Sequence, residues 1–170
     1  MLPALKESTP GVDWQAVETA AARNEPTAEQ RSFAMGSYIA NMFVVLVLTL
    51  SMARWWHGVL DNPGGFGREF RELRFGPRLG IVAVALTALA LFAGGWLGQL
   101  GLKLLPTLLV LPMLQGLAIA HAIAKPHRAG KYWLIGVYVL PMFNPLLLVA
   151  IVVVGLLDPW IGFRERWARA

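Results

Sequence analysis

The sequence contains no cysteine, and only 15% of its 170 residues are charged. Without cysteine the chain can form neither a disulfide framework nor a thiolate metal site. A soluble domain usually has about 25% charged residues. The deficit, together with 56% hydrophobic residues, indicates an integral membrane protein. A net charge of +5 beside apolar segments favours the anionic headgroups of the lipid bilayer over nucleic acid as the partner.

Signatures of the common catalytic and cofactor sites are also missing. The chain has no Walker A loop, no Gly-x-Gly-x-x-Gly after a strand and no His-Glu-x-x-His. Its three histidines, His57, His121 and His127, are scattered, whereas a metal site needs clustered ligands. No serine, histidine and acid arrangement suggests nucleophilic catalysis. We therefore expect no enzyme activity, no cofactor and no metal site.

Residues 1–33 form a polar N-terminal tail ahead of the first apolar run. They lack the basic and apolar regions that make up a signal peptide. Asp13 is placed to cap a short helix, and Thr27 with Gln30 indicates a second helix start through a capping box. We expect this second helix to run directly into the first membrane span.

Residues 34–170 are predicted to form an all-α membrane domain, a bundle of four transmembrane helices. The predicted spans are 34–54, 79–98, 104–124 and 132–157, each near the ~20 residues that cross a bilayer. A tight connection at Gln99–Lys103 makes the second and third spans an antiparallel hairpin.

A polar, basic and aromatic stretch from Ala53 to Phe75, here called the island, separates the first span from the other three. Asn62-Pro63-Gly64-Gly65 is typical of a turn. Phe66, Phe70 and Leu73 then recur at helical spacing, with charged residues on the other side. This pattern predicts an amphipathic helix along the membrane surface, and the alternative is an ordinary charged loop. Residues 58–76 are expected outside the hydrocarbon, with the positive-inside rule slightly favouring the cytoplasmic side.

Four polar side chains within the predicted spans are the candidate binding residues: Asn41, Gln115, His121 and Asn144. Asn41, with Ser37 at i−4, marks a face that should look into protein. The prolines around Asn144 should bend or unwind the fourth span, and transporters bind substrate at such interruptions. The structural alternatives are helix packing for Asn41, a hydrogen-bonded structural role for His121 and a simple proline kink at Asn144.

Small residues recur every three or four positions along the second span, and this stripe would allow another helix to approach closely. Its members are Gly80, Ala83, Thr87, Ala90 and Gly94. The stripe is therefore a candidate contact surface for a membrane-protein partner.

Three stretches together carry a resemblance to a known family. They are the island, the segment from Gln115 to His121, and the ending Gly155-x-x-Asp158-x-Trp160-x-x-Phe163-Arg164-x-Arg166. Over roughly residues 40–167 the chain resembles the YybS-like bacterial membrane proteins of unknown function. The positions matched to the family's motifs are Arg54, Trp55, Asn62, Pro63, Gly64, Gly65, Phe66, Asp158 and Arg164.

The resemblance implies a shortened member, equivalent to the C-terminal half, in the bacterial cytoplasmic (inner) membrane with several spans. The family's distant similarity to the substrate-binding membrane subunits of energy-coupling vitamin transporters implies a solute-binding or transport-associated component, by analogy of fold. The alternative is a non-catalytic membrane interaction or assembly protein. The small-residue stripe and the missing half favour this alternative.

Overall fold

The computed structural model describes residues 11–126 and 128–167, and 86% of these residues are helical, with no strand among them. The all-α prediction is confirmed at this level. Eight helices are described in this part of the chain. They are α2 (Trp14–Asn24), α3 (Ala28–Asp61), α4 (Gly65–Glu72), α5 (Pro77–Phe92), α6 (Gly95–Ala124), α7 (Gly130–Phe143), α8 (Pro145–Ile161) and α9 (Phe163–Trp167).

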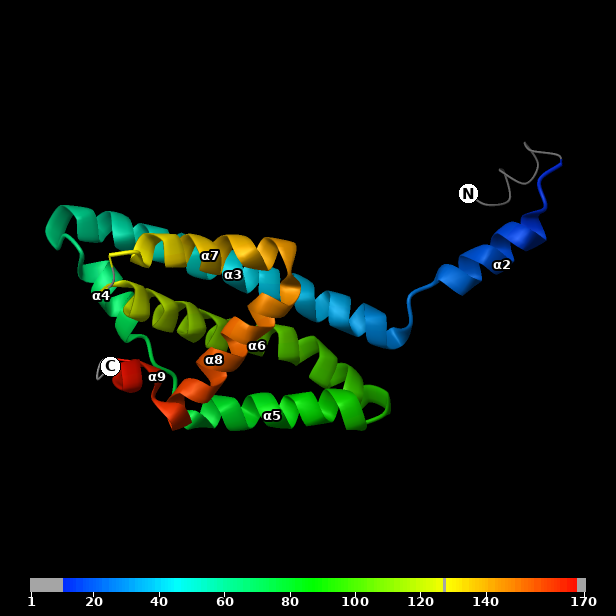
Figure 1. Ribbon diagram of the computed structural model, residues 1–170. Coiled ribbons are helices and arrows are strands. Elements are labelled where there is room, and N and C mark those ends of the chain that lie inside the picture. Colours follow the sequence, from blue (N-terminus) through cyan, green and yellow to red (C-terminus); the bar gives the residue numbers. More distant parts are fainter. Residues whose placement is uncertain (1–10, 127, 168–170) are drawn as a thin grey trace.

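Both predicted helix starts in the N-terminal tail are confirmed. The Asp13 side chain accepts a hydrogen bond from the backbone of Ala16 and caps α2. Thr27 and Gln30 form a reciprocal capping box, which satisfies two backbone donors at the start of α3. From there α3 runs 34 residues without a break, so it crosses the expected boundary between tail and membrane domain. In Figure 1, α2 lies apart from the other helices.

The predicted helix in the island is also present. After α3 ends, Gly64 adopts φ +83°, which suits glycine, and α4 begins at the next residue. Phe66 and Phe70 stack on one side, with ring centroids 6.2 Å apart, whereas Arg68 and Glu69 are exposed. The turn and the helix are therefore confirmed, except that Leu73 lies just beyond the end of α4. The position of this helix along the membrane surface stays a prediction.

The hairpin between the second and third spans turns earlier than expected. The break lies at Ala93 and Gly94, and Gly95 takes φ +62° as α6 begins. The segment Gln99–Lys103, predicted as the connection, is helical. The prediction was wrong because two adjacent glycines permit the reversal, while nothing in 99–103 obliges a helix to stop.

The predicted fourth span is interrupted at Asn144, as its prolines indicated. Asn144 takes an extended conformation between α7 and α8, and its side-chain oxygen accepts a hydrogen bond from the backbone of Leu146, 3.0 Å away. Beyond the break, α8 turns back toward the end of the molecule where α7 begins (Figure 1). Tyr132 of α7 and Phe163 of α9 consequently line the same cavity.

Helix α6 is the centre of the bundle. It packs against α3, α5 and α8, and also touches α4, α7 and α9. The most deeply buried side chains belong mainly to it: Pro112, Gln115, Ala118 and Ile119. The buried core is therefore small and centred on α6.

Two helices, α3 and α6, are long and apolar enough to span a membrane. The bent pair α4–α5, with 59° between its halves, could form a third span. In contrast, α7 and α8 have 14 and 17 residues, and a transmembrane helix usually needs ~20. The structure therefore supports a helical membrane protein, while a bundle of four spans is not clearly present.

Candidate functional site

Among the described residues, a group of buried polar contacts lies where α8 crosses α6. The crossing is close because glycines face each other: a Cβ on Gly155 would collide with the backbone of Pro112, and one on Gly116 with that of Ile151. Small residues permit such backbone approach between membrane helices. The crossing brings Gln115, beside Gly116, within reach of Asp158, one turn after Gly155.

Gln115 connects three separate segments, although its side chain is almost fully buried. Its Nε2 donates to Asp158 Oδ2, 3.1 Å away. Its Oε1 accepts from the backbone N–H of Phe75 at 2.8 Å. Asp158 Oδ1 in turn accepts from the backbone N–H of Phe163 at 3.1 Å. Each of these buried polar groups is therefore paired, as low-dielectric surroundings require.

Arg164 completes this cluster from α9. Its two terminal nitrogens donate to the carbonyl oxygens of Arg71 and Leu73, both at 2.7 Å. These carbonyls lie at the C-terminal end of α4, where helix carbonyls lack intrahelical partners. Arg164 Nε lies 3.9 Å from Asp158 Oδ2 and is buried without a hydrogen bond. We call Gln115, Asp158, Arg164 and the backbone of residues 71–75 the polar junction.

Burial lowers the pKa of the Arg164 guanidinium from its usual value. The carboxylate of Asp158 acts in the opposite direction and raises the pKa, while Arg74 lowers it. Because an arginine in a protein stays protonated, the buried cation depends on Asp158 and on the two carbonyls of α4. The junction thus connects α4, α6, α8 and α9. Loss of one partner would leave a buried charged or polar group unpaired, which lowers the free energy of unfolding.

A small cavity of about 220 Å³ adjoins the junction. Arg74, Gln115, Asp158 and Glu165 contribute to its lining. Arg74 and Glu165 form an exposed ion pair at 3.2 Å, beside the buried contacts. Both carboxylates and the guanidinium in its lining therefore already have partners.

The four candidate binding residues do not converge. Gln115 lies in the junction. Asn144 is exposed, and its side chain caps the start of α8, which is a structural role although not the simple proline kink of the alternative. The Nδ1 atom of His121 lies 2.8 Å from the carbonyl of Leu117, and its ring contacts the rings of Phe70 and Tyr138. Asn41 is exposed and does not face the rest of the chain.

The motif positions in the island have local roles. Arg54 forms an exposed ion pair with Glu69 at 2.5 Å and so connects α3 to α4. Trp55 contacts the neighbouring Trp56 edge to face. Asn62, Pro63 and Gly64 form the turn, Gly65 begins α4 against the Asn62 side chain, and Phe66 stacks on Phe70.

The small-residue stripe of α5 is largely occupied by this chain's own helices. Gly80 lies against the indole of Trp160, and Ala83 is 2% exposed. The backbone of Ala90 lies close to Gly101 of α6. Gly94 has open space around it. Most of the stripe therefore serves the α5–α6 hairpin and the contact with α8.

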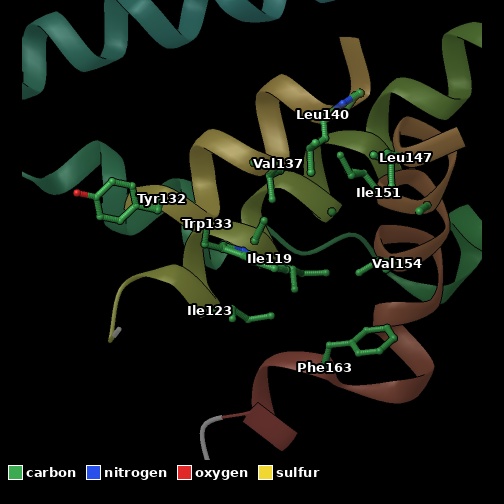
Figure 2. Close-up of a pocket in the computed structure, with 15 residues that line it drawn as sticks. Ile119, Ile123, Tyr132, Trp133, Val137, Leu140, Leu147, Ile151, Val154 and Phe163 are labelled. Carbon is green, nitrogen blue, oxygen red and sulfur yellow. The ribbon is translucent and has the colours of Figure 1, made fainter. Parts of the chain in front are cut away.

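A second cavity, about 460 Å³, lies between α6, α7 and α8. Figure 2 shows Ile119 and Ile123 of α6, Val137 and Leu140 of α7, and Ile151 of α8 around this cavity. No pattern in the sequence predicts this cavity, which is called the groove below. In the sequence, the apolar residues that line it cannot be distinguished from residues that face lipid. The cavity exists because α8 turns back and forms one of its walls.

No protein-family model matches the chain, and no curated protein or solved structure matches it significantly. The resemblance to the YybS-like family therefore stays a prediction. Its matched residues nevertheless include Asp158 and Arg164, which the structure brings together with Gln115. The backbone groups of residues 71–75 that bond to Gln115 and Arg164 could not be found from the motif, because every residue has such groups.

No group of three or more His, Asp or Glu side chains that could hold a metal ion occurs among residues 11–126 and 128–167. His127, one of the three scattered histidines, lies outside the described residues.

Proposed function

We propose that this chain is a non-catalytic interaction or assembly protein of a bacterial cytoplasmic membrane, and that α3 binds a membrane helix of another chain. The observation that carries this proposal is the position of Asn41. Its side chain is exposed and makes no hydrogen bond within residues 11–126 and 128–167. It lies within the apolar part of α3, where no water would be available.

The exposed face of α3 is well defined. Tyr38, Asn41, Val45 and Leu48 follow at helical spacing, and the three apolar or aromatic members are each at least half exposed. The opposite face, with Gly36, is buried against α6. In its most apolar window α3 is only 6% buried, compared with 44% for α6. Lipid could cover an apolar face alone, but it cannot hydrogen-bond an amide.

An unsatisfied amide in hydrocarbon costs several kcal/mol. A facing helix with a polar side chain removes this cost, and asparagine commonly hydrogen-bonds across membrane helices for this reason. Thr49 provides a contrast on the same helix, since its hydroxyl already donates to the carbonyl of Val45 at 2.8 Å. Asn41 is therefore a polar group within the apolar part of α3 that needs a partner from elsewhere.

The alternative, a solute-binding or transport-associated component, has weaker support. It required Asn41, Gln115 and Asn144 to converge on a lined cavity. Gln115 is satisfied by Asp158 and Phe75, Asn144 is satisfied by Leu146, and Asn41 faces outward. The larger cavity has an almost entirely apolar lining. A polar solute such as a vitamin would find few hydrogen-bonding groups there.

The membrane layout forms part of this proposal. In it α3, α5 and α6 cross the bilayer, with α4 at the surface. The α7–α8 hairpin enters from the island side and returns to it, which replaces the predicted fourth crossing. Two contacts support this layout: Arg164 bonds to the end of α4, and Phe163 shares a cavity with Tyr132. At 16 residues, or about 24 Å, α5 is short for a span, and such a mismatch is accommodated by local thinning.

The test uses site-specific crosslinking along α3 in native membranes. A photoreactive residue at Val45 should give a defined product with another chain, whereas one at Val47, on the side toward α6, should not. Asn41→Leu should reduce this product roughly fivefold, since an interhelical hydrogen bond in a membrane contributes about 1 kcal/mol.

Thr49→Val is the matched control, because its hydroxyl is already bonded within α3. It should leave the product unchanged. A product of equal intensity in wild type and Asn41→Leu would refute the role of Asn41. If photoreactive residues at Val45 and Val47 gave the same amount of product, the proposal that the exposed face of α3 binds another chain would be refuted.

A further inference from the structure

We propose that the groove between α6, α7 and α8 holds an acyl chain of one anionic phospholipid, whose phosphate is bound by the basic turn between α6 and α7. The basic turn is defined here as Lys125, Arg128 and Lys131. This inference concerns a different surface from the exposed face of α3 and does not depend on a partner chain binding there.

The groove has the dimensions and chemistry of a site for an apolar ligand. Its volume of about 460 Å³ lies within the ~300–1,000 Å³ of small-molecule pockets. Of the side chains that line it, only those of Tyr132 and Trp133 carry a polar atom. The remainder are apolar residues such as Ile119, Val137 and Leu147, shown around the cavity in Figure 2. An acyl chain is apolar along its length and could pack against all of these side chains.

The two polar side chains of the lining lie at one end of the groove. Tyr132 and Trp133 are more than half exposed and directly follow Lys131 in the first turn of α7. Ile123, which also lines the groove, lies two residues before Lys125. The basic turn is therefore at the mouth. Tyrosine and tryptophan favour the headgroup layer, which places this mouth at the membrane surface.

The charge at the mouth is uncompensated. Lys125, Arg128 and Lys131 are all exposed, and none forms an ion pair within the described part of the chain. The sequence has no acidic residue between Glu72 and Asp158, and Asp158 is held in the polar junction. Basic pockets between membrane helices bind anionic headgroups, so the charge favours an anionic over a zwitterionic lipid.

The α7–α8 hairpin explains why a space is left between these three helices. Because α8 turns back at Asn144, the inner sides of α7 and α8 face α6 without filling the space between them. A lipid chain supplies the missing packing atoms there, and dispersion contacts are the main packing force between apolar groups in a bilayer.

The test is native mass spectrometry of the purified full chain in detergent, with phosphatidylglycerol or phosphatidylcholine of identical acyl chains. We expect one phosphatidylglycerol to stay bound per chain and to bind more tightly than phosphatidylcholine. The triple variant Lys125→Gln, Arg128→Gln, Lys131→Gln should weaken phosphatidylglycerol roughly hundredfold, at about 1 kcal/mol for each charge near the surface. Phosphatidylcholine should bind this variant as it binds wild type.

A matched triple variant, Arg31→Gln, Arg68→Gln and Arg78→Gln, removes three exposed charges elsewhere and should retain the bound lipid. Gly136→Leu tests the groove itself. A Cβ on Gly136 meets only Leu140, at 3.8 Å, so the larger side chain has room to occupy the cavity. It should abolish retention of both lipids while the unfolding temperature without lipid stays near that of wild type.

If Gly136→Leu does not fold, Ala120→Val fills the same cavity from α6 and should weaken both lipids. Equal affinity for the two lipids in wild type would overturn the proposal, as would equal losses in the two triple variants. Displacement of the lipid by glycerol phosphate alone would also overturn it, because the site would then bind a free anion without an acyl chain. Unchanged retention in both filling variants would exclude the groove.

Discussion

The side-chain amide of Gln115 donates a hydrogen bond to the carboxylate of Asp158 across 3.1 Å, although 43 residues separate them in the chain. Gly116 and Gly155 make this contact possible, since each lets the backbone of α6 approach that of α8. The same carboxylate lies beside Arg164, which reaches the carbonyls at the end of α4. The island is thereby fixed to the bundle by polar contacts that are partly buried.

We first predict that Asp158→Ala strongly destabilises the protein. The variant leaves the Arg164 guanidinium buried without its carboxylate, and removing one partner of a buried ion pair costs about 3–5 kcal/mol. The free energy of unfolding, measured by denaturant titration in detergent micelles, should fall by this amount. The double variant Asp158→Ala, Arg164→Leu should be less destabilised than Asp158→Ala alone, because the unpaired charge is gone.

Asp61→Ala is the control for this prediction. Asp61 also pairs with a basic side chain, His57 at 3.0 Å, but both are about two-thirds exposed. Exposed pairs of this kind contribute about 0–1 kcal/mol. Equal destabilisation by Asp158→Ala and Asp61→Ala would show that the junction does not contribute to stability.

A second prediction concerns Asn144. Its side chain caps α8 through Leu146, so Asn144→Ala should lower the free energy of unfolding by about 0.5–2 kcal/mol. Asn144→Ser, which retains a capping oxygen, should restore most of this loss. Both variants should stay folded by circular dichroism. Identical stabilities of the alanine and serine variants would contradict the capping role.

A third prediction distinguishes three crossings from four. In this cysteine-free chain, single cysteines at Asp61, Lys131 and Arg166 should all react with a membrane-impermeant thiol reagent from one side. A cysteine at Gln99 should react from the other side, and one at Val47 should be protected within α3. If α7 and α8 instead formed a single crossing, Arg166 would be labelled from the side of Gln99.

Local features of this chain were predictable from sequence because neighbouring residues cause them. The capping box of Thr27 and Gln30, the turn at Gly64 and the break at Asn144 each depend on residues within a few positions. The helical, membrane-associated class followed from long apolar runs and a low content of charge. The hairpin between α5 and α6 was misplaced because several nearby glycines could have provided the turn.

Only the tertiary structure determined which polar residues meet and where the chain goes after Asn144. A helix break shows that the direction can change, but packing against α6 determines the new direction of α8. That return places Asp158 and Arg164 beside the island and away from Asn41 and Asn144. The partners of Gln115 and Arg164 include backbone groups of residues 71–75. Every residue has such groups, so the contact depends on three-dimensional proximity, which the local sequence does not specify.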